Sequence, residues 1–193
     1  MIAFLRGKLV SKTPSAVVIE CGGVGYEALA PLTTIEQLPP PGAEVFLLTD
    51  FVVRAESQTL FGFLRERERE IFRRLIKVSG VGAKTALALM SALRADELLA
   101  ALSEGDSARL SRAPGIGKKT AERIIVDFRG SPLLEMVDGA PPAASGDRDV
   151  ESALAGLGYK KPEIARALAS IPADTGDDSA VRLRAALQTL SGR

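Results

Sequence analysis

Two stretches of seven residues, GVGAKTA at 80–86 and GIGKKTA at 115–121, decide the interpretation of this chain. They share the pattern Gly-apolar-Gly-x-Lys-Thr-Ala and begin 35 residues apart. Apolar segments come before and after each stretch, so each is predicted to be a tight turn between two helices. Glycine allows the backbone to turn sharply and allows a ligand to approach it closely.

Each turn is expected to bind an anion. The first N–H groups of the helix that follows have no acceptor within that helix, and the positive end of the helix dipole lies at the same place. Lys84 in the first stretch, and Lys118 and Lys119 in the second, add positive charge. Two such sites on one rigid unit suggest the repeating phosphates of a nucleic-acid backbone.

The alternative is a pair of helix turns that bind no ligand, because many helices end on glycine. It accounts less well for the Lys-Thr-Ala that follows both turns. A P-loop is excluded, since it needs G-x-x-x-x-G-K-[ST] after a strand and the segment from Gly115 to Lys118 lacks that spacing. The repeated pattern is similar to the helix-hairpin-helix motif, which grips DNA phosphates through backbone amides without reading bases.

Positive charge is concentrated around the two turns. The 193-residue chain has a formal net charge of +1, but residues 65–130 contain 14 basic and 9 acidic residues. The segments 1–64 and 131–193 each have a net charge of −2. This local excess fits an electrostatic footprint for nucleic acid.

The composition excludes several function classes. The chain has no His and a single Cys, Cys21, which rules out an internal disulfide, a Cys/His zinc site and His-dependent catalytic triads. No catalytic residue, metal or cofactor is predicted. The first residues contain too short an apolar run for a signal peptide, and no run of ~18 apolar residues occurs. A cytoplasmic protein without membrane spans is expected.

Residues 1–64 are predicted to form a β-barrel. A short helix is predicted at 31–38, where Thr33 and Glu36 fit a capping box. Five strands with a helix between the third and fourth is the order of an OB-type barrel; another small barrel is the alternative. The hairpin tip between the last two strands is predicted at Arg54–Ser57. The five predicted strands are 2–10, 16–21, 25–30, 45–54 and 57–63.

Residues 65–130 are predicted to form an all-helical tandem of two helix-hairpin-helix units. Residues 131–147, rich in glycine, proline and small side chains in their second half, are predicted to be a flexible linker. Residues 148–193 are predicted to form a three-helix domain. In it, Gly158 ends the first helix, Pro162 lies in the first turn of the second, and Asp178 caps the third.

The stretch Leu157-Gly158-Tyr159 resembles the turn of ubiquitin-associated (UBA-like) three-helix domains, which bind other proteins through that turn. Leu157 and Tyr159 are therefore candidate partner-binding residues. The alternative is that both side chains belong only to the domain core.

The order of barrel, tandem hairpins, linker and three-helix tail resembles the RuvA family, the Holliday-junction-binding subunit of bacterial branch migration. The resemblance covers the whole chain. It implies a homotetramer with fourfold symmetry, or an octamer of two tetramers, that performs no chemistry and holds an open four-way DNA junction. It also implies that the tail recruits the RuvB ring ATPase, with the RuvC resolvase as a further partner. The motifs that carry it are Gly22-Gly23-Val24-Gly25-Tyr26-Glu27, Phe51-Val52-Val53-Arg54, Gly62-Phe63, Leu75-Ile76-Lys77, Gly80-Val81-Gly82, the run from Pro114 to Arg123, and Leu157-Gly158-Tyr159.

The resemblance also implies which residues contact DNA phosphates. The residues of this chain that match the family's hairpins are Gly80, Gly82, Lys84, Thr85, Gly115, Gly117, Lys118, Lys119 and Thr120.

The predicted hairpin tip departs from the family pattern. The family usually has two adjacent acidic residues after Arg54, an acidic pin whose carboxylates repel phosphates and disfavour the entry of plain duplex. This chain has Ala55 in the first position and Glu56 in the second. We expect a weakened pin rather than none.

Two other functions are considered. A DNA repair nuclease or glycosylase would use the hairpins for grip but needs clustered carboxylates or a Lys/Asp pair, and Asp127 is a lone candidate. The second alternative is an adaptor that works through its tail and contacts RNA through the basic segment.

Overall fold

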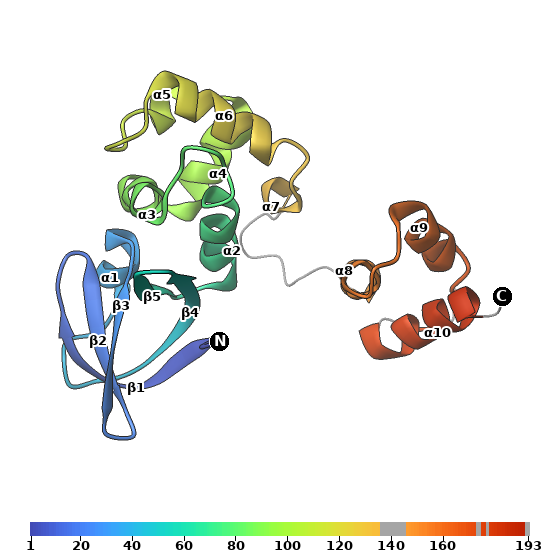
Figure 1. The fold of residues 1–193 in the computed structure, drawn as a ribbon, viewed down its shortest axis with the longest axis horizontal. Coiled ribbons are helices and arrows are strands. Elements are labelled where there is room, and N and C mark those ends of the chain that lie inside the picture. The colour runs from blue at the N-terminus through green and yellow to red at the C-terminus, as the bar shows by residue number, and fades with distance from the viewer. Residues whose placement is uncertain (136–145, 173–174, 177, 192–193) are drawn as a thin grey trace. The chain divides into compact units, whose positions relative to one another are not determined.

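The computed structural model describes residues 1–135, 146–172, 175–176 and 178–191. The chain divides into two compact units, Met1–Asp138 and Gly139–Arg193. Within the described residues, the first unit contains both the barrel and the helices that follow it, and the second contains the three helices α8 to α10 (Figure 1). None of the helices in the described ranges is long and apolar enough to cross a membrane.

Five strands close into a barrel in the order β1-β2-β3-β5-β4. β1 pairs with β4 through its first half and with β2 through its second half, which closes the barrel. All pairs are antiparallel except β3 and β5, which run parallel. The prediction of an OB-type barrel with a helix between the third and fourth strands is confirmed. The elements are β1 (Phe4–Lys12), β2 (Ala16–Cys21), β3 (Val24–Leu29), α1 (Leu32–Gln37), β4 (Glu44–Arg54) and β5 (Ser57–Phe63).

The barrel interior is filled by alternate residues of its strands, as a period of two requires. On β1, Leu5 and Leu9 are buried whereas Phe4 and Arg6 are exposed. Gly7, between Leu5 and Leu9, lies so close to β2 that an added Cβ would be 2.0 Å from the carbonyl oxygen of Glu20. Glycine at this position therefore lets the two strands approach each other.

The start of α1 differs from the prediction. Pro31 precedes the helix and no side chain caps it, so the predicted capping box of Thr33 and Glu36 is wrong. The Thr33 hydroxyl donates instead to the carbonyl oxygen of Met90, at 2.9 Å. Because Met90 lies 57 residues away in the chain, a tertiary contact outcompetes the local bond that the sequence pattern suggested.

Six helices follow the barrel among the described residues of the first unit. They are α2 (Glu66–Leu75), α3 (Ala83–Ala92), α4 (Ala95–Glu104), α5 (Ser107–Leu110), α6 (Lys118–Phe128) and α7 (Pro132–Glu135). The tandem hairpins are α2 with α3 and α5 with α6, and α4 connects them. The 35-residue repeat continues through their core, because both members of each equivalent pair are buried. These pairs are Leu75/Leu110, Val78/Ala113, Val81/Ile116, Ala86/Ala121, Leu89/Ile124, Met90/Ile125 and Leu93/Phe128.

Two buried phenylalanines of β5, Phe61 and Phe63, belong to the core of the helices. The ring of Phe72 in α2 lies 4.7 Å from that of Phe61 and 5.1 Å from that of Phe63, both on β5. The Arg73 guanidinium also donates to the Asp50 carboxylate at 2.6 Å. These contacts hold the hairpins against the barrel, which matters for the site because β4 and β5 carry the predicted tip.

The predicted linker at 131–147 begins with structured residues. Pro132–Glu135 form α7, Ser131 and Leu133 are buried, and α7 packs against α4. Residues 136–145 of the predicted linker lie outside the described residues.

The second unit is a three-helix domain, as predicted. Its helices are α8 (Gly146–Gly156), α9 (Lys161–Ala169) and α10 (Ser179–Ser191). Gly158 has a φ of 92° just after α8, which makes it the predicted C-terminal glycine. Pro162 lies in the first turn of α9, and the Asp178 carboxylate accepts from the Ala180 N–H at 2.8 Å. The buried core consists of Val150, Leu154, Ile164, Ala167 and Ala186.

Candidate nucleic-acid interface

The two glycine turns have the same backbone conformation. Gly80 and Gly115 have φ values of 88° and 82°, in the left-handed region that favours glycine. Gly82 and Gly117 both have a φ of −86° and a ψ of 168° at the start of the helix that follows. The sequence repeat is therefore a repeat of backbone geometry.

The hydrogen bonds of the two turns also match. The Val81 N–H donates to Val78 O at 3.0 Å, and the equivalent Ile116 N–H donates to Ala113 O at 3.2 Å. The carbonyl oxygens of Gly82 and Gly117 each accept the first helical bond at 2.9 Å. Among the described residues, no acceptor is present for the N–H groups of Gly82, Ala83, Lys84, Thr85, Gly117, Lys118, Lys119 and Thr120.

The unpaired donors face solvent. All four turn glycines are exposed, as are Lys84, Lys118 and Lys119, while Thr85 and Thr120 are half-buried. Each helix N-terminus thus combines free N–H groups, the positive end of a dipole and at least one ammonium group, which together attract an anion. Binding of DNA phosphates by these residues remains a prediction.

Gly82 and Gly117 are glycines that the fold itself does not require. Their backbone conformation is available to other residues, and a Cβ added at either position would meet no atom within 4 Å. Glycine at such a place leaves room for something outside the protein to approach the backbone. By contrast, the positive φ of Gly80 and Gly115 gives those glycines a conformational role.

The two turns are in contact with each other. Arg123 of α6 donates from Nη1 to the carbonyl oxygen of Ser79 at 2.9 Å. A methyl group added to Gly115 would lie 3.8 Å from the Thr85 side chain. The two sets of free N–H groups therefore belong to one continuous surface of the first unit.

Three cations near the turns were absent from the predicted site. Arg123 is exposed and contacts the first turn, and Lys77 and Arg112 are exposed at equivalent positions, three residues before Gly80 and Gly115. Extending the 35-residue comparison towards the N-terminus would have found the Lys77/Arg112 pair. Nothing in the sequence alone indicated the Arg123 contact, because Ser79 is 44 residues away.

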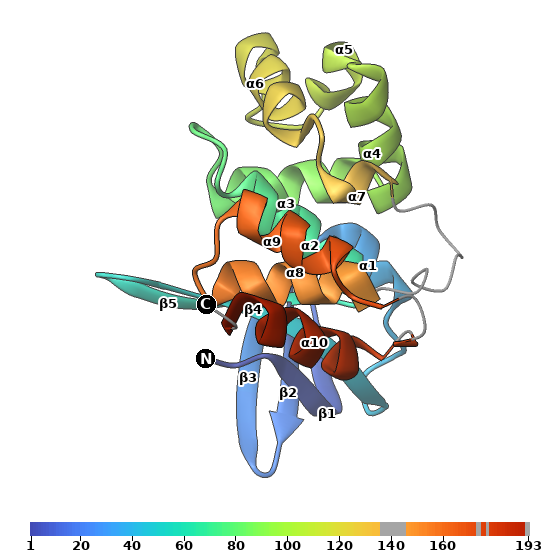
Figure 2. The same cartoon turned by 90° about the vertical axis from the view of Figure 1, so that its right-hand side faces the viewer.

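The predicted tip is a tight hairpin that extends away from the barrel (Figure 2). Arg54 pairs with Ser57, and Ala55 and Glu56 form the two-residue connection, all exposed. The formal charges of Arg54 and Glu56 cancel. The tip thus has one carboxylate and no net charge.

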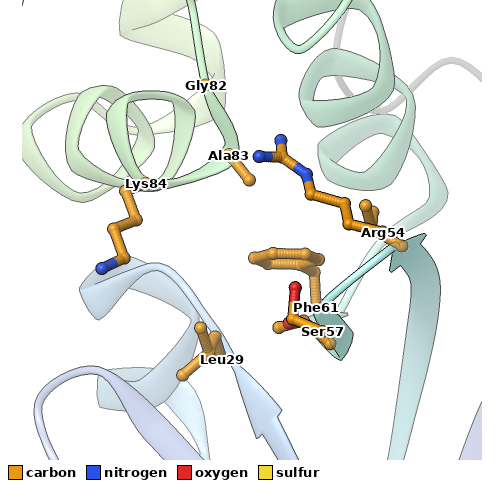
Figure 3. A pocket seen from close by; sticks show the side chains of 9 residues that line it. Leu29, Arg54, Ser57, Phe61, Gly82, Ala83 and Lys84 are labelled. Carbon is orange, nitrogen blue, oxygen red and sulfur yellow. The ribbon is translucent and has the colours of Figure 1, made fainter.

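Arg54 and the first turn line the same pocket, which has a volume of about 310 Å³ (Figure 3). Its sides come from β3, β4, β5 and the start of α3. Figure 3 shows the Arg54 side chain reaching towards Ala83 while the Phe61 ring lies below it. The tip and the first hairpin are thereby brought together. The second turn does not line this pocket.

The described residues offer little to the nuclease or glycosylase alternative. Asp127 is exposed on α6. Across the described ranges, no group of three or more His, Cys, Asp or Glu side chains could hold a metal ion.

The second unit carries the predicted partner-binding turn. Leu157 is 61% exposed, whereas Tyr159 is half-buried and packs against the three-helix core. The interpretation of both side chains as core residues therefore does not hold for Leu157. An exposed leucine beside a glycine turn is available to a partner.

Comparison with known proteins gives three family matches along the chain. The family described as RuvA N terminal domain matches residues 1–62, the SAM-like helix-hairpin-helix tandem matches 72–129, and RuvA, C-terminal domain matches 148–191.

Full-length relatives are also found. The Holliday junction branch migration complex subunit RuvA of Neisseria gonorrhoeae is 48% identical over 187 residues, which are 95% of this chain and 96% of that protein. The subunit of the same name from Methylobacillus flagellatus is 44% identical over 194 residues, 99% of each chain. The one from Chromobacterium violaceum is 47% identical over 189 residues.

Proposed function

Because this chain belongs to the RuvA family of Holliday junction branch migration complex subunits, we propose that it binds four-way DNA junctions through their phosphates. The observation that carries the proposal is the pair of matching turns with exposed, unpaired N–H groups on one surface. Such donors recognise the geometry of the backbone and not the base sequence.

The direct test compares a synthetic four-way junction with linear duplex of the same sequence and length. Junction affinity should exceed duplex affinity, should not depend on base sequence, and should fall steeply as salt rises, by ~0.9 in log affinity per neutralised phosphate for each log unit of salt. Equal affinity for junction and duplex would contradict the proposal. Competition with structured RNA tests the alternative function as an RNA-contacting adaptor, for which RNA should displace the four-way junction.

The chain is a subunit of a branch migration complex by family, and we propose its partners accordingly. It forms a homotetramer, or an octamer of two such tetramers, performs no chemistry itself, and works in the cytoplasm. Its tail recruits the RuvB ATPase, which moves the arms, and RuvC is a further partner on the junction. Native mass spectrometry with and without a synthetic junction distinguishes tetramer from octamer.

Replacing Leu157 by Ser should weaken RuvB recruitment about tenfold and leave junction binding unchanged. The reason is that an exposed leucine loses its apolar contact with the partner on this change, at little cost to a core it does not enter. Co-sedimentation of RuvB with the chain on junction DNA measures RuvB recruitment. Val181, 45% exposed on α10, serves as the control position, and equal losses for V181S and L157S would contradict a specific role.

Replacing Glu56 by Ala should lower the junction-over-duplex affinity ratio about threefold. That factor corresponds to the repulsion of one carboxylate about 6 Å from a phosphate in water. Restoring the second acid by Ala55→Glu should raise the ratio by a similar factor, since the tip would regain a net negative charge. Both effects should shrink as salt screens them. A ratio that E56A leaves unchanged at several salt concentrations contradicts the pin.

A further inference from the structure

The first turn is tied to the second hairpin through a backbone carbonyl. Arg123 Nη1 donates to Ser79 O at 2.9 Å. The next residue, Gly80, has a φ of 88°, and a methyl group added to it would lie 3.8 Å from the same nitrogen. The guanidinium therefore lies directly beside the peptide that joins Ser79 to Gly80.

This bond fixes which way the Ser79–Gly80 peptide faces. In a planar trans peptide, the C=O and N–H groups point in opposite directions. Holding the carbonyl towards Arg123 turns the Gly80 N–H away from it, and no acceptor for that N–H is present among the described residues. Glycine at positive φ has little steric barrier to rotation of the peptide plane. A rotated plane would present a carbonyl oxygen where the proposed function needs a donor.

The second turn achieves the same backbone conformation by other means. Counting 35 residues along the repeat, Pro114 stands where Ser79 stands, and Ala88 stands where Arg123 stands. Proline restricts its own φ to about −65° and is common at the second position of a tight turn that has glycine at positive φ in the third position, as Ala113 to Ile116 have. Ala88 has no side-chain donor. One turn is thus restrained by a proline ring and the other by a guanidinium from its neighbour.

We propose that Arg123 is a positioning residue, which holds the Ser79–Gly80 peptide so that the N–H groups of the first turn face the DNA backbone. The inference rests on the proposed junction binding. It differs from a direct phosphate contact by Arg123, because the guanidinium acts here through the turn.

The test is a rescue experiment on the full chain. Arg123→Met removes the donor but keeps an unbranched side chain, and should weaken junction binding about tenfold, as expected for a lost hydrogen bond to a charged group. Adding Ser79→Pro should recover most of that loss. The second turn demonstrates that this backbone accepts proline, and the Ser79 N–H has no acceptor among the described residues that proline would forfeit.

Two variants serve as controls. Ser79→Pro alone is the reference with which the double variant is compared, and Arg129→Met, an exposed cation at the end of α6, reports the effect of lost charge alone. If Arg123 only contacted a phosphate, proline at position 79 could not compensate for its loss. A double variant that binds no better than R123M overturns the proposal.

Hydrogen exchange without DNA separates this inference from the proposed function. Arg123→Met should speed exchange of the Val81 amide, which donates within the first turn, but not of Ile116, its equivalent in the second. Equal exchange at Val81 in both proteins overturns the inference. Failure of the unaltered chain to bind any junction overturns the proposed function, whereas the exchange result still decides how the turn is held.

Discussion

Replacing Lys84, Lys118 and Lys119 together by Ala is expected to weaken junction binding by about two to three orders of magnitude near 0.1 M salt. If each ammonium neutralises one phosphate, the slope of log affinity against log salt should become shallower by about 2.7. The three lysines are exposed at the two helix starts, so their removal leaves the core intact. Titration of a labelled junction at four or more salt concentrations measures both affinity and slope.

The control for this variant removes the same net charge elsewhere. Lys8 on the barrel and Lys160 and Lys161 on the three-helix tail are also exposed. Their triple Ala variant should retain most of the affinity and nearly the full salt slope. Equal slopes for the two triple variants would mean that the whole protein's charge, and not the two turns, drives binding.

The second large effect is expected from the double variant Gly82→Ala, Gly117→Ala. A methyl group at each position points into open space in the free protein, where the proposed function places a phosphate. Binding should therefore weaken about a hundredfold, because a methyl group in each turn keeps the DNA phosphate from approaching the N–H groups of the protein backbone. Stability should change by no more than about 1 kcal/mol, since alanine is a poorer N-terminal cap than glycine but costs less chain entropy on folding.

Measuring affinity and stability together distinguishes a glycine needed for DNA binding from a glycine needed for folding. Thermal unfolding and junction titration are measured on the same preparations, with Gly156→Ala at the end of α8 as the matched control outside the hairpins. Full junction affinity in the double variant would show that the space above Gly82 and Gly117 is not the phosphate site. A large drop in the unfolding midpoint would instead show that the fold needs these glycines.

Much of the fold follows from local patterns in the sequence. The strands at 16–21 and 57–63 have the predicted bounds, because alternation along a strand reports directly on which of its sides is buried. The predicted capping box at Thr33 failed for the opposite reason. Its hydroxyl had a better acceptor on Met90, in a distant segment, and no local pattern contains that information.

The candidate site divides in the same way. The turn glycines and their lysines were found from the sequence, because a repeated pattern of seven residues marks both copies. The Arg123 contact to Ser79 and the approach of Arg54 to the first turn were not found. Both join segments separated by more than 25 residues in the chain, and their pairing depends on how the helices pack on one another and on the barrel.

The sequence by itself determined that two glycine turns each open a helix with lysines at its start, since backbone freedom and helix polarity are local properties. Tertiary structure alone decided that the turns lie side by side, that a guanidinium from one holds a carbonyl of the other, and that the tip of the barrel reaches the same surface. The physical reason is that side-chain packing between distant segments, through the core around Phe72, sets those relative positions.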